Sequence, residues 1–316
     1  MRKEGRIRKL ADMLTASYQE HERIIRRDAS QQVSLAAVTD ILAVLRELVF
    51  AGFFGRKRLK SDSLEFYVGE LLEEVSHSLQ KQIARALRHG SCRLADTLAA
   101  DIPDEAERIT YAFLERLPQV RALLATDVDA AFDGDPAAFD ADEIILAYPG
   151  VYAIMVSRLA HELYLLKVPF IPRLMTEHAH SLTGIDIHPG ASIGHHFFID
   201  HGTGIVIGET TEIGDYVKIY QGVTLGALST RGGQMLHGVK RHPIIESHVT
   251  IYSGASILGG ATRIGEGVVI GSNAFITRSV PDKTRVSVKN PELQFMENRQ
   301  AQPVEFPQES FWSYEI

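Results

Sequence analysis

Residues 185–226 read IDIHPGASIGHHFFIDHGTGIVIGETTEIGDYVKIYQGVTLG, and isoleucine or leucine returns in this stretch at every sixth position from 187 with one exception. Small residues follow several of these positions, as in Ile193-Gly194. A fixed six-residue period is typical of a parallel β-helix, in which each step is one short strand and one corner, and three steps make one triangular coil. The aliphatic side chain points into the prism, and stacked coils bury each other's edges. The pattern therefore predicts a parallel β-helix that continues to Ile276.

The regularity of this repeat fails at three places, and a binding site has to be built there, because a regular prism has no cleft. The first break is a step of eight residues instead of six, and it contains Asp200 and His201. The second is a longer, Gly-rich and basic stretch that ends in Arg241 and His242. The three breaks lie at 199–207, 225–245 and 257–264.

Composition argues against several classes of protein. The net charge of -7 disfavours nucleic acid as the main partner. The single cysteine, Cys92, excludes an intrachain disulfide and is typical of a reducing compartment. No apolar run approaches the length of a membrane span, and the basic N-terminal stretch is not followed by the apolar segment of a signal peptide. We therefore predict a cytoplasmic protein that binds neither nucleic acid nor membrane.

We predict an α+β fold in three segments. Residues 1–182 form an all-helical domain used for oligomerisation, residues 183–286 form a left-handed parallel β-helix that carries the candidate site, and residues 287–316 form an extended tail. In the helical domain, apolar stripes follow candidate N-caps such as Ser34 and Ser63. We interpret these stripes as core and oligomer packing.

His201 is a candidate general base. Parallel β-helices of this period often belong to acyltransferases that use acyl-CoA, and the acceptor hydroxyl must lose its proton as it attacks the thioester. A histidine within reach can take that proton, which is worth roughly 10²–10⁴ in rate. Asp186 lies nearly one coil earlier, and a carboxylate there could fix the imidazole tautomer from an adjacent coil or subunit. The spacing is equally compatible with a surface histidine at a corner.

Charged residues elsewhere suggest how a substrate could be held. Arg241 and His242 offer a fixed cation and a hydrogen-bond donor suited to a carboxylate, although a solvated basic loop would have the same composition. Acidic residues crowd a short linker, where most of them are expected to serve turns and helix N-caps. One of them could bind a substrate amine, and the pattern leaves open which. These acidic residues are Asp133, Asp135, Asp140, Asp142 and Glu143.

Together these motifs closely resemble the serine acetyltransferases. The resemblance is carried by DIHPGASIGHHFFIDHGTGIVIGET at 186–210, YQGVTLG at 220–226 and a loop that ends RHP at 241–243, and it covers roughly residues 130–280. It implies transfer of an acetyl group from acetyl-CoA to the hydroxyl of L-serine, giving O-acetyl-L-serine for L-cysteine biosynthesis. It also implies that acetyl-CoA is a co-substrate and that neither a permanently bound cofactor nor a metal is needed.

The resemblance assigns a role to each site residue. It makes His201 the general base of a direct transfer and Asp186 the carboxylate partner of that histidine. From the acidic linker it selects Asp135, through a D-P-A motif. The serine-binding groups it implies are Asp135, Asp200, Arg241 and His242, and the groups near pantetheine are Gly226, Ala227 and Ser253.

The resemblance also implies partners. Members of this family assemble as trimers or as dimers of trimers, and L-cysteine competes at the serine site as a feedback inhibitor. A C-terminal isoleucine inserts into the active site of cysteine synthase, and this chain ends in Ile316. Two departures from the commonest bacterial pattern are Ala227 in place of glycine and a longer loop over residues 227–241.

Two rival functions share the prism. One is an O-acetyltransferase that acts on a sugar or xenobiotic hydroxyl, which would not need Arg241 or Asp135. The other is a metal lyase similar to the γ-class carbonic anhydrases, although the DIHP and RHP motifs point away from it. Its candidate ligands would be His188, His195, His196 and His201.

Overall fold

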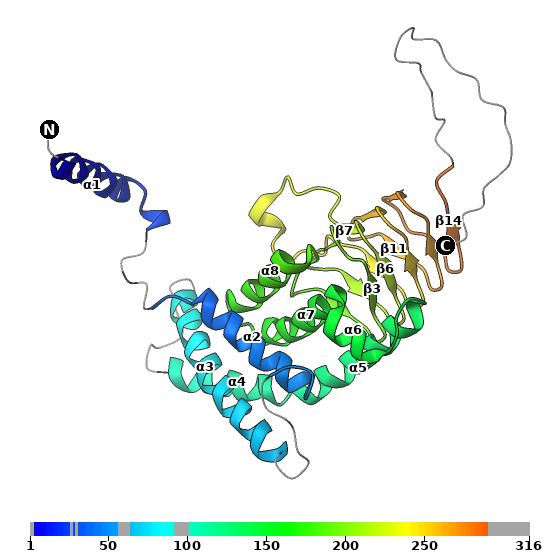
Figure 1. Cartoon of the computed structure of the whole chain (residues 1–316). Coiled ribbons are helices and arrows are strands. Elements are labelled where there is room, and N and C mark those ends of the chain that lie inside the picture. Colours follow the sequence, from blue (N-terminus) through cyan, green and yellow to red (C-terminus); the bar gives the residue numbers. More distant parts are fainter. Residues whose placement is uncertain (1–2, 26–27, 29–30, 56–63, 92–100, 290–316) are drawn as a thin grey trace, which may run out of the picture.

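The structure is a computed structural model that describes residues 3–25, 28, 31–55, 64–91 and 101–289 (Figure 1). A helical region precedes a prism of short strands along the chain, and the prism packs against the helices at its N-terminal end. The helices are α1 (Lys3–Glu20), η1 (Glu22–Ile24), α2 (Leu35–Val49), α3 (Leu64–Ser91), α4 (Ile102–Leu114), α5 (Leu117–Gly134), α6 (Ala141–Ala147), α7 (Pro149–Leu165), α8 (Ile171–Thr183) and η4 (Gly233–Leu236).

Local sequence signals explain where these helices begin and end. Ser34 caps α2 as predicted, because its side chain accepts a hydrogen bond from the backbone N–H of Ala37 at 3.3 Å. The other predicted cap, Ser63, lies outside the described residues. Pro149 opens α7 and separates it from α6, and the two helices meet at 73°. In the part of the chain that the structure describes, no single helix is long and apolar enough to cross a membrane, and only this bent pair passes that test together.

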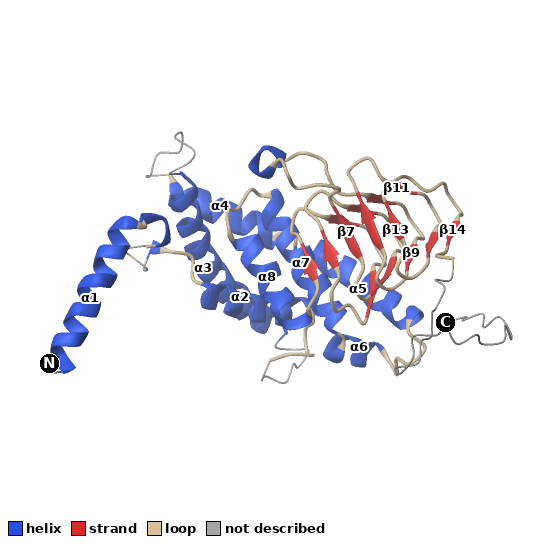
Figure 2. Cartoon of the chain, turned by 90° about the horizontal axis from the view of Figure 1, so that it is seen from above, coloured by secondary structure: helices blue, strands red, loops and turns tan. Residues whose placement is uncertain are grey.

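The strands form three parallel sheets, which are the three faces of the prism (Figure 2). The first face has the order β1-β4-β7-β10-β13, the second β11-β8-β5-β2, and the third β14-β12-β9-β6-β3. The strands are β1 (Asp186–Ile187), β2 (Ser192–Ile193), β3 (Phe198–Asp200), β4 (Val206–Ile207), β5 (Glu212–Ile213), β6 (Lys218–Tyr220), β7 (Thr224–Gly226), β8 (Ile244–Ile245), β9 (Thr250–Ile251), β10 (Ser256–Leu258), β11 (Arg263–Ile264), β12 (Val269–Ile270), β13 (Phe275–Ile276) and β14 (Arg285–Val286).

The aliphatic positions of the repeat line the inside of the prism. From Ile187 to Ile276 they are buried, except for Ile193, which is half-buried. This confirms the predicted α+β fold, in which a helical region precedes a left-handed parallel β-helix of about five coils. α8 ends at Thr183 and β14 ends at Val286, close to the predicted domain boundaries, and the division into domains itself stays a prediction.

The eight-residue step is a bulge that leaves the register of the coils intact. Before it, Asp200 pairs with Tyr220 in the parallel ladder, and after it the backbone N–H of Gly222 donates to Thr203 at 3.0 Å. The two additional residues are therefore His201 and Gly202, which have left-handed backbone angles φ of 58° and 82°. This region of φ is uncommon for residues other than glycine. The neighbouring coil fixes both sides of the step, so the additional residues are accommodated at the corner: His201 is exposed there, whereas Gly202 is buried, and a Cβ on it would lie 2.5 Å from the Ile185 side chain.

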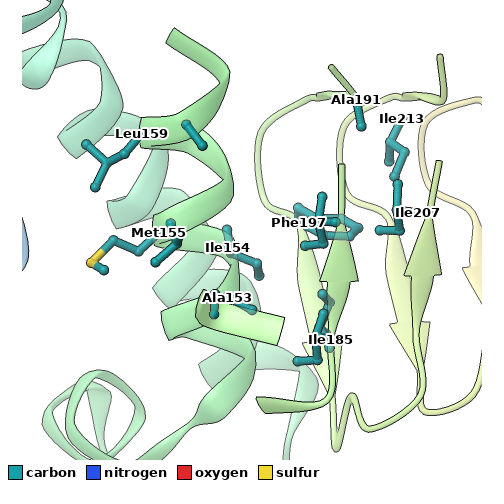
Figure 3. Close-up of a cluster of buried hydrophobic side chains, with 14 of the residues drawn as sticks. Ala153, Ile154, Met155, Leu159, Ile185, Ala191, Phe197, Ile207 and Ile213 are labelled. Atoms are coloured by element: carbon teal, nitrogen blue, oxygen red, sulfur yellow. The ribbon is translucent and has the colours of Figure 1, made fainter. Parts of the chain in front are cut away.

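Apolar packing and one buried ion pair join the helical region to the first coil. Side chains of α7 such as Ile154 face Phe197 and Ile185 across this junction (Figure 3). Arg158 of α7 forms a two-pronged ion pair with Asp127 of α5, at 2.6 and 2.7 Å. The same guanidinium donates to the carbonyls of residues 193 and 194 in the prism, and Asp127 accepts from the N–H of Phe197.

We expect the Asp127→Asn substitution to destabilise the protein strongly. Asp127 and Arg158 are 1% and 6% exposed, so the substitution leaves an unpaired charge in the interior. Loss of one partner of a buried pair costs roughly 3–5 kcal/mol, and chemical denaturation would measure the change in the free energy of unfolding. Glu105→Gln is the matched control, because its pair with Arg108 lies at the surface and should contribute about 1 kcal/mol or less. Equal effects of the two substitutions would contradict a structural role for the buried pair.

Candidate active site

The predicted site residues fall into two groups at opposite edges of the first face. The leading edge is the series of corners that run into β4, β7, β10 and β13, and the trailing edge is where these strands end. His201 projects from the leading edge just before β4. Arg241 precedes β8 in the chain and lies at the trailing edge, beside the corner that follows β4. Its backbone N–H donates to the hydroxyl of Thr210 in that corner at 2.9 Å. One strand of a single chain therefore separates the two groups.

The His201 imidazole is exposed at the leading edge. Its side chain is 68% exposed, and its Nδ1 lies 3.3 Å from Oδ1 of Asp200, whose side chain is only 14% exposed. With its proton on Nδ1, on the side of the Asp200 carboxylate, the neutral imidazole keeps Nε2 as an acceptor. The arrangement suits a general base that receives a proton from a bound hydroxyl.

Asp135 reaches the same edge from the helical region, as the C-cap of α5. Its carboxylate accepts hydrogen bonds from the Tyr148 hydroxyl at 2.5 Å and from the N–H of Ala137 at 2.9 Å. The hydrogen bond from Tyr148 lowers the pKa of Asp135, and the same contact raises the pKa of Tyr148 to about 12. The Asp135 carboxylate is therefore charged at neutral pH. The same group of side chains includes His201, which also lowers the pKa of Asp135, and Asp200, which also raises the pKa of Tyr148. Two carboxylates beside an exposed imidazole suit a substrate that carries an ammonium group.

Lys218 holds the end of α5 against the prism. Its Nζ donates to the carbonyl of Gly134 at 2.6 Å and lies 4.9 Å from the ring centroids of both Phe198 and Tyr220. A lysine at a helix C-terminus satisfies a free carbonyl and interacts favourably with the helix dipole. Gly134 permits this close approach, because a Cβ there would lie 2.6 Å from the Phe198 ring. Lys218 therefore helps to set the position of the next residue, Asp135.

At the trailing edge, Arg241 is restrained from several directions. Its guanidinium forms an ion pair with Glu209 and donates to the carbonyls of Leu236 at 3.2 Å and Val239 at 3.4 Å. Glu209 is 8% exposed and also accepts from the Tyr164 hydroxyl at 3.1 Å. The buried carboxylate fixes the direction of the arginine, while the arginine also organises the long loop that precedes it.

His242 packs into the corner beside Arg241. Its Nδ1 accepts a hydrogen bond from the N–H of Thr210 at 3.0 Å, and its ring fills the space where a Cβ on Gly208 would lie. Burial, and then the charge of Arg241, lower the pKa of His242 to about 4. The imidazole is therefore neutral at physiological pH, where it can act as a hydrogen-bonding group without adding charge.

The structure does not pair Asp186 with His201 inside one chain. Asp186 lies on β1, and its Oδ1 is 3.5 Å from Nη1 of Arg173 in α8. In the described part of the chain, no hydrogen bond or ion pair joins Asp186 to His201, whose carboxylate neighbour is Asp200. The role of Asp186 stays a prediction that requires either a neighbouring copy or movement of the exposed imidazole away from Asp200.

The residues predicted near pantetheine follow the same division between edges. Gly226 ends β7 at the trailing edge, where its carbonyl accepts from the N–H of Gly259 at 3.0 Å, and Ala227 follows it. Ser253 lies on the leading edge, and its hydroxyl is 3.3 Å from that of Ser272. Both sets lie further along the prism than His201, toward its C-terminal end.

The four histidines of the rival metal site do not converge. Among the described residues, the group whose ligand atoms lie close enough to share a metal ion is Glu177, His180 and Asp186. Arg173 already forms ion pairs with both carboxylates of that group. His188 accepts from the N–H of Gly190, and the other three histidines lie at other corners of the prism, so a single chain does not bring the four together.

Sequence reasoning missed three residues that shape these groups. Tyr148, Lys218 and Glu209 orient Asp135 and Arg241, and none of them stands at an inward position of the repeat. Glu209 lies inside the motif at 186–210, which assigned it no role. Lys218 is a cation on a strand between two aromatic residues on neighbouring outward positions, and that pattern could have drawn attention to it.

The chain is similar to serine acetyltransferases in both sequence and structure. No family model matches it. It is 46% identical over 252 residues to the plasmid serine acetyltransferase of Synechococcus elongatus. The aligned region covers 78% of this chain and 79% of that protein. Serine acetyltransferase isoform 3 of Entamoeba histolytica, solved in complex with cysteine, superposes with a TM-score of 0.69 at 34% identity over 92% of this chain and 94% of that one. The enzyme of Neisseria gonorrhoeae, solved in complex with serine, gives a TM-score of 0.52 at 27% identity over 79% and 95%.

We expect His242 to make stability depend on pH in the mildly acidic range. Its pKa is about 4 in the folded chain and near 6.5 when unfolded, so the unfolded chain binds the proton more tightly and stability falls as pH falls. Between pH 7.5 and pH 5 this loss should be about 2 kcal/mol. His242→Gln should flatten the dependence measured by chemical denaturation, whereas His195→Gln, at an exposed corner, should leave it unchanged. An unaltered slope in His242→Gln would show that the ring titrates normally.

Proposed function

Because the chain belongs to the serine acetyltransferase family, we propose that it transfers the acetyl group of acetyl-CoA to the hydroxyl of L-serine, giving O-acetyl-L-serine and CoA. The observation that supports this most directly is the leading-edge group itself. An exposed imidazole beside two carboxylates fits an amino acid whose ammonium and hydroxyl lie close together. A neutral sugar acceptor has no ammonium group for Asp135 and Asp200 to bind.

The reaction proceeds by direct transfer. The serine ammonium binds between Asp135 and Asp200, which places the hydroxyl next to Nε2 of His201. The imidazole removes the hydroxyl proton as the serine oxygen attacks the thioester carbonyl, and a carboxylate on the other ring nitrogen, which we propose is that of Asp186, stabilises the imidazolium that forms. The tetrahedral intermediate then expels the CoA thiolate, which takes the proton back from His201. Protons therefore balance within the site.

The complete site requires two copies of the chain. Arg241 and His242 supply the groups for the serine carboxylate, but they lie across a strand from His201 in the same chain. We propose a homotrimer in which the leading edge of one prism faces the trailing edge of the next. A closed ring of copies pairs every leading edge with a trailing edge, as heterologous contacts do in a cyclic assembly. The helical domain would allow a dimer of such trimers.

Two carboxylates are candidates for the partner of His201. Asp200 occupies that position in the single chain, and Asp186 matches the family motif. We propose that Asp186 acts in the assembled enzyme, where a bound serine ammonium draws Asp200 away from the imidazole. Asp186→Asn would then lower kcat with little effect on the KM for serine.

We also propose that L-cysteine inhibits the enzyme at the serine site. Cysteine differs from serine by a thiol in place of the hydroxyl, so the same ammonium and carboxylate contacts would hold it. The proposed contact with cysteine synthase through Ile316 falls on the C-terminal tail, outside the described residues. Cytoplasmic location likewise remains our prediction.

We expect His201→Ala to lower kcat for serine acetylation by roughly 10²–10⁴ while the protein still folds and assembles. CoA release from acetyl-CoA with L-serine as acceptor measures the reaction, and sugar acceptors serve as the comparison. His195→Ala removes an exposed histidine from a neighbouring corner and should retain full activity. A wild-type enzyme that acetylates sugars but not serine would refute the proposed function, and near wild-type kcat in His201→Ala would refute the mechanism.

We expect inactive copies to complement one another if the site is shared. His201→Ala and Arg241→Ala should each be nearly inactive alone. After dissociation and reassembly as an equal mixture, about a quarter of the sites should combine an intact leading edge with an intact trailing edge, so about a quarter of the activity should return. Mixing without dissociation is the control. Failure to recover activity in mixed assemblies would show that each chain carries a complete site.

A further inference from the structure

The leading edge carries one polar side chain in each coil below the His201 bulge. Thr203, Gln221, Ser253 and Ser272 each stand three positions before the next strand of the first face. Their stacking is fixed by backbone hydrogen bonds, from the N–H of Gly254 to the carbonyl of Gln221 at 2.9 Å and from that of Asn273 to Ser253 at 2.9 Å. The four residues therefore form a straight polar column that begins at the proposed base and runs toward the C-terminal coil.

Gln221 is the unexplained member of this column. Its side-chain oxygen is buried and has no hydrogen-bond partner among the residues that the structure describes. Such an unsatisfied group costs about 1–3 kcal/mol, and an apolar side chain would avoid the cost. The serines of the column, by contrast, contact each other. A polar residue that the fold itself does not need is a candidate for ligand binding.

The position of Gln221 matches the chemistry of the acyl donor. The carbonyl carbon of an acyl-CoA is followed by sulfur, two methylene groups and the first amide nitrogen, an extended distance of roughly 5 Å. Neighbouring coils are spaced by about 4.7–4.9 Å. With the thioester at the level of His201, a pantetheine arm that follows the corner places its first amide at the next coil, where Gln221 stands.

We propose that Gln221 binds the first amide of the pantetheine arm of acetyl-CoA, with its side-chain oxygen accepting the amide N–H. This rests on the proposed function. The terminal torsion of a glutamine is soft, so the amide can turn its oxygen toward a donor that arrives at the corner. Ser253 and Ser272 continue the same column and face the later part of the arm. On a neighbouring copy, Gly226 and Ala227 would form the opposite wall, at the other end of β7 from Gln221.

Truncated acyl donors test this contact. N,S-diacetylcysteamine keeps the first amide of the arm, whereas S-ethyl thioacetate lacks it. With wild-type enzyme and L-serine, we expect the amide-containing donor to have the higher kcat/KM. In Gln221→Leu this preference should fall by about tenfold, and the KM for acetyl-CoA should rise by a similar factor while the KM for serine stays unchanged. Gln119→Leu, at an exposed position of α5, is the matched control.

A second variant protects the test against a folding defect. Gln221→Glu keeps an acceptor oxygen at the same position and should retain the donor preference. An unchanged preference in a folded Gln221→Leu enzyme overturns the inference, as does an equal rise in the KM for serine. Calorimetric titration with CoA alone separates this result from the proposed function: weaker CoA binding by Gln221→Leu supports the contact even if serine proves not to be the acceptor.

Discussion

Everything at the site depends on the parallel register between stacked coils. Each inward aliphatic side chain must meet its counterpart one coil away, so the strands on both sides of a corner cannot shift. Additional residues must therefore be accommodated at the corner. Of the two that the long step adds, Gly202 is buried against Ile185 and Ile199, and His201 is exposed.

The helical region supplies the second half of the leading-edge group through polar contacts. The ion pair of Arg158 and Asp127 holds α7 and α5 against the first coil, and Lys218 binds the C-terminal carbonyl of α5. Asp135 is the residue directly after the end of α5, so these contacts between the helices and the prism set its distance from the His201 imidazole. The same logic applies at the trailing edge, where buried Glu209 aims Arg241.

The fold could be predicted from the sequence because a six-residue period has one structural solution, and the site residues could be named because their motifs are specific. The pairing of Asp186 with His201 could not be judged in this way. Sequence spacing places the two residues one coil apart, but it does not show that α8 presents Arg173 to Asp186 or that Asp200 lies nearer. Tyr148, Lys218 and Glu209 escaped prediction since a contact between distant segments leaves no local period.

Corners that accept additional residues without moving their neighbours give this architecture an evolutionary freedom that most enzymes lack. In a quasi-one-dimensional fold, an insertion at one corner is felt by that coil and by little else. The same prism of stacked coils can therefore carry loops of different length at its corners, such as the one between β7 and β8. New acceptor specificities can arise by lengthening a corner, with no repacking of the interior.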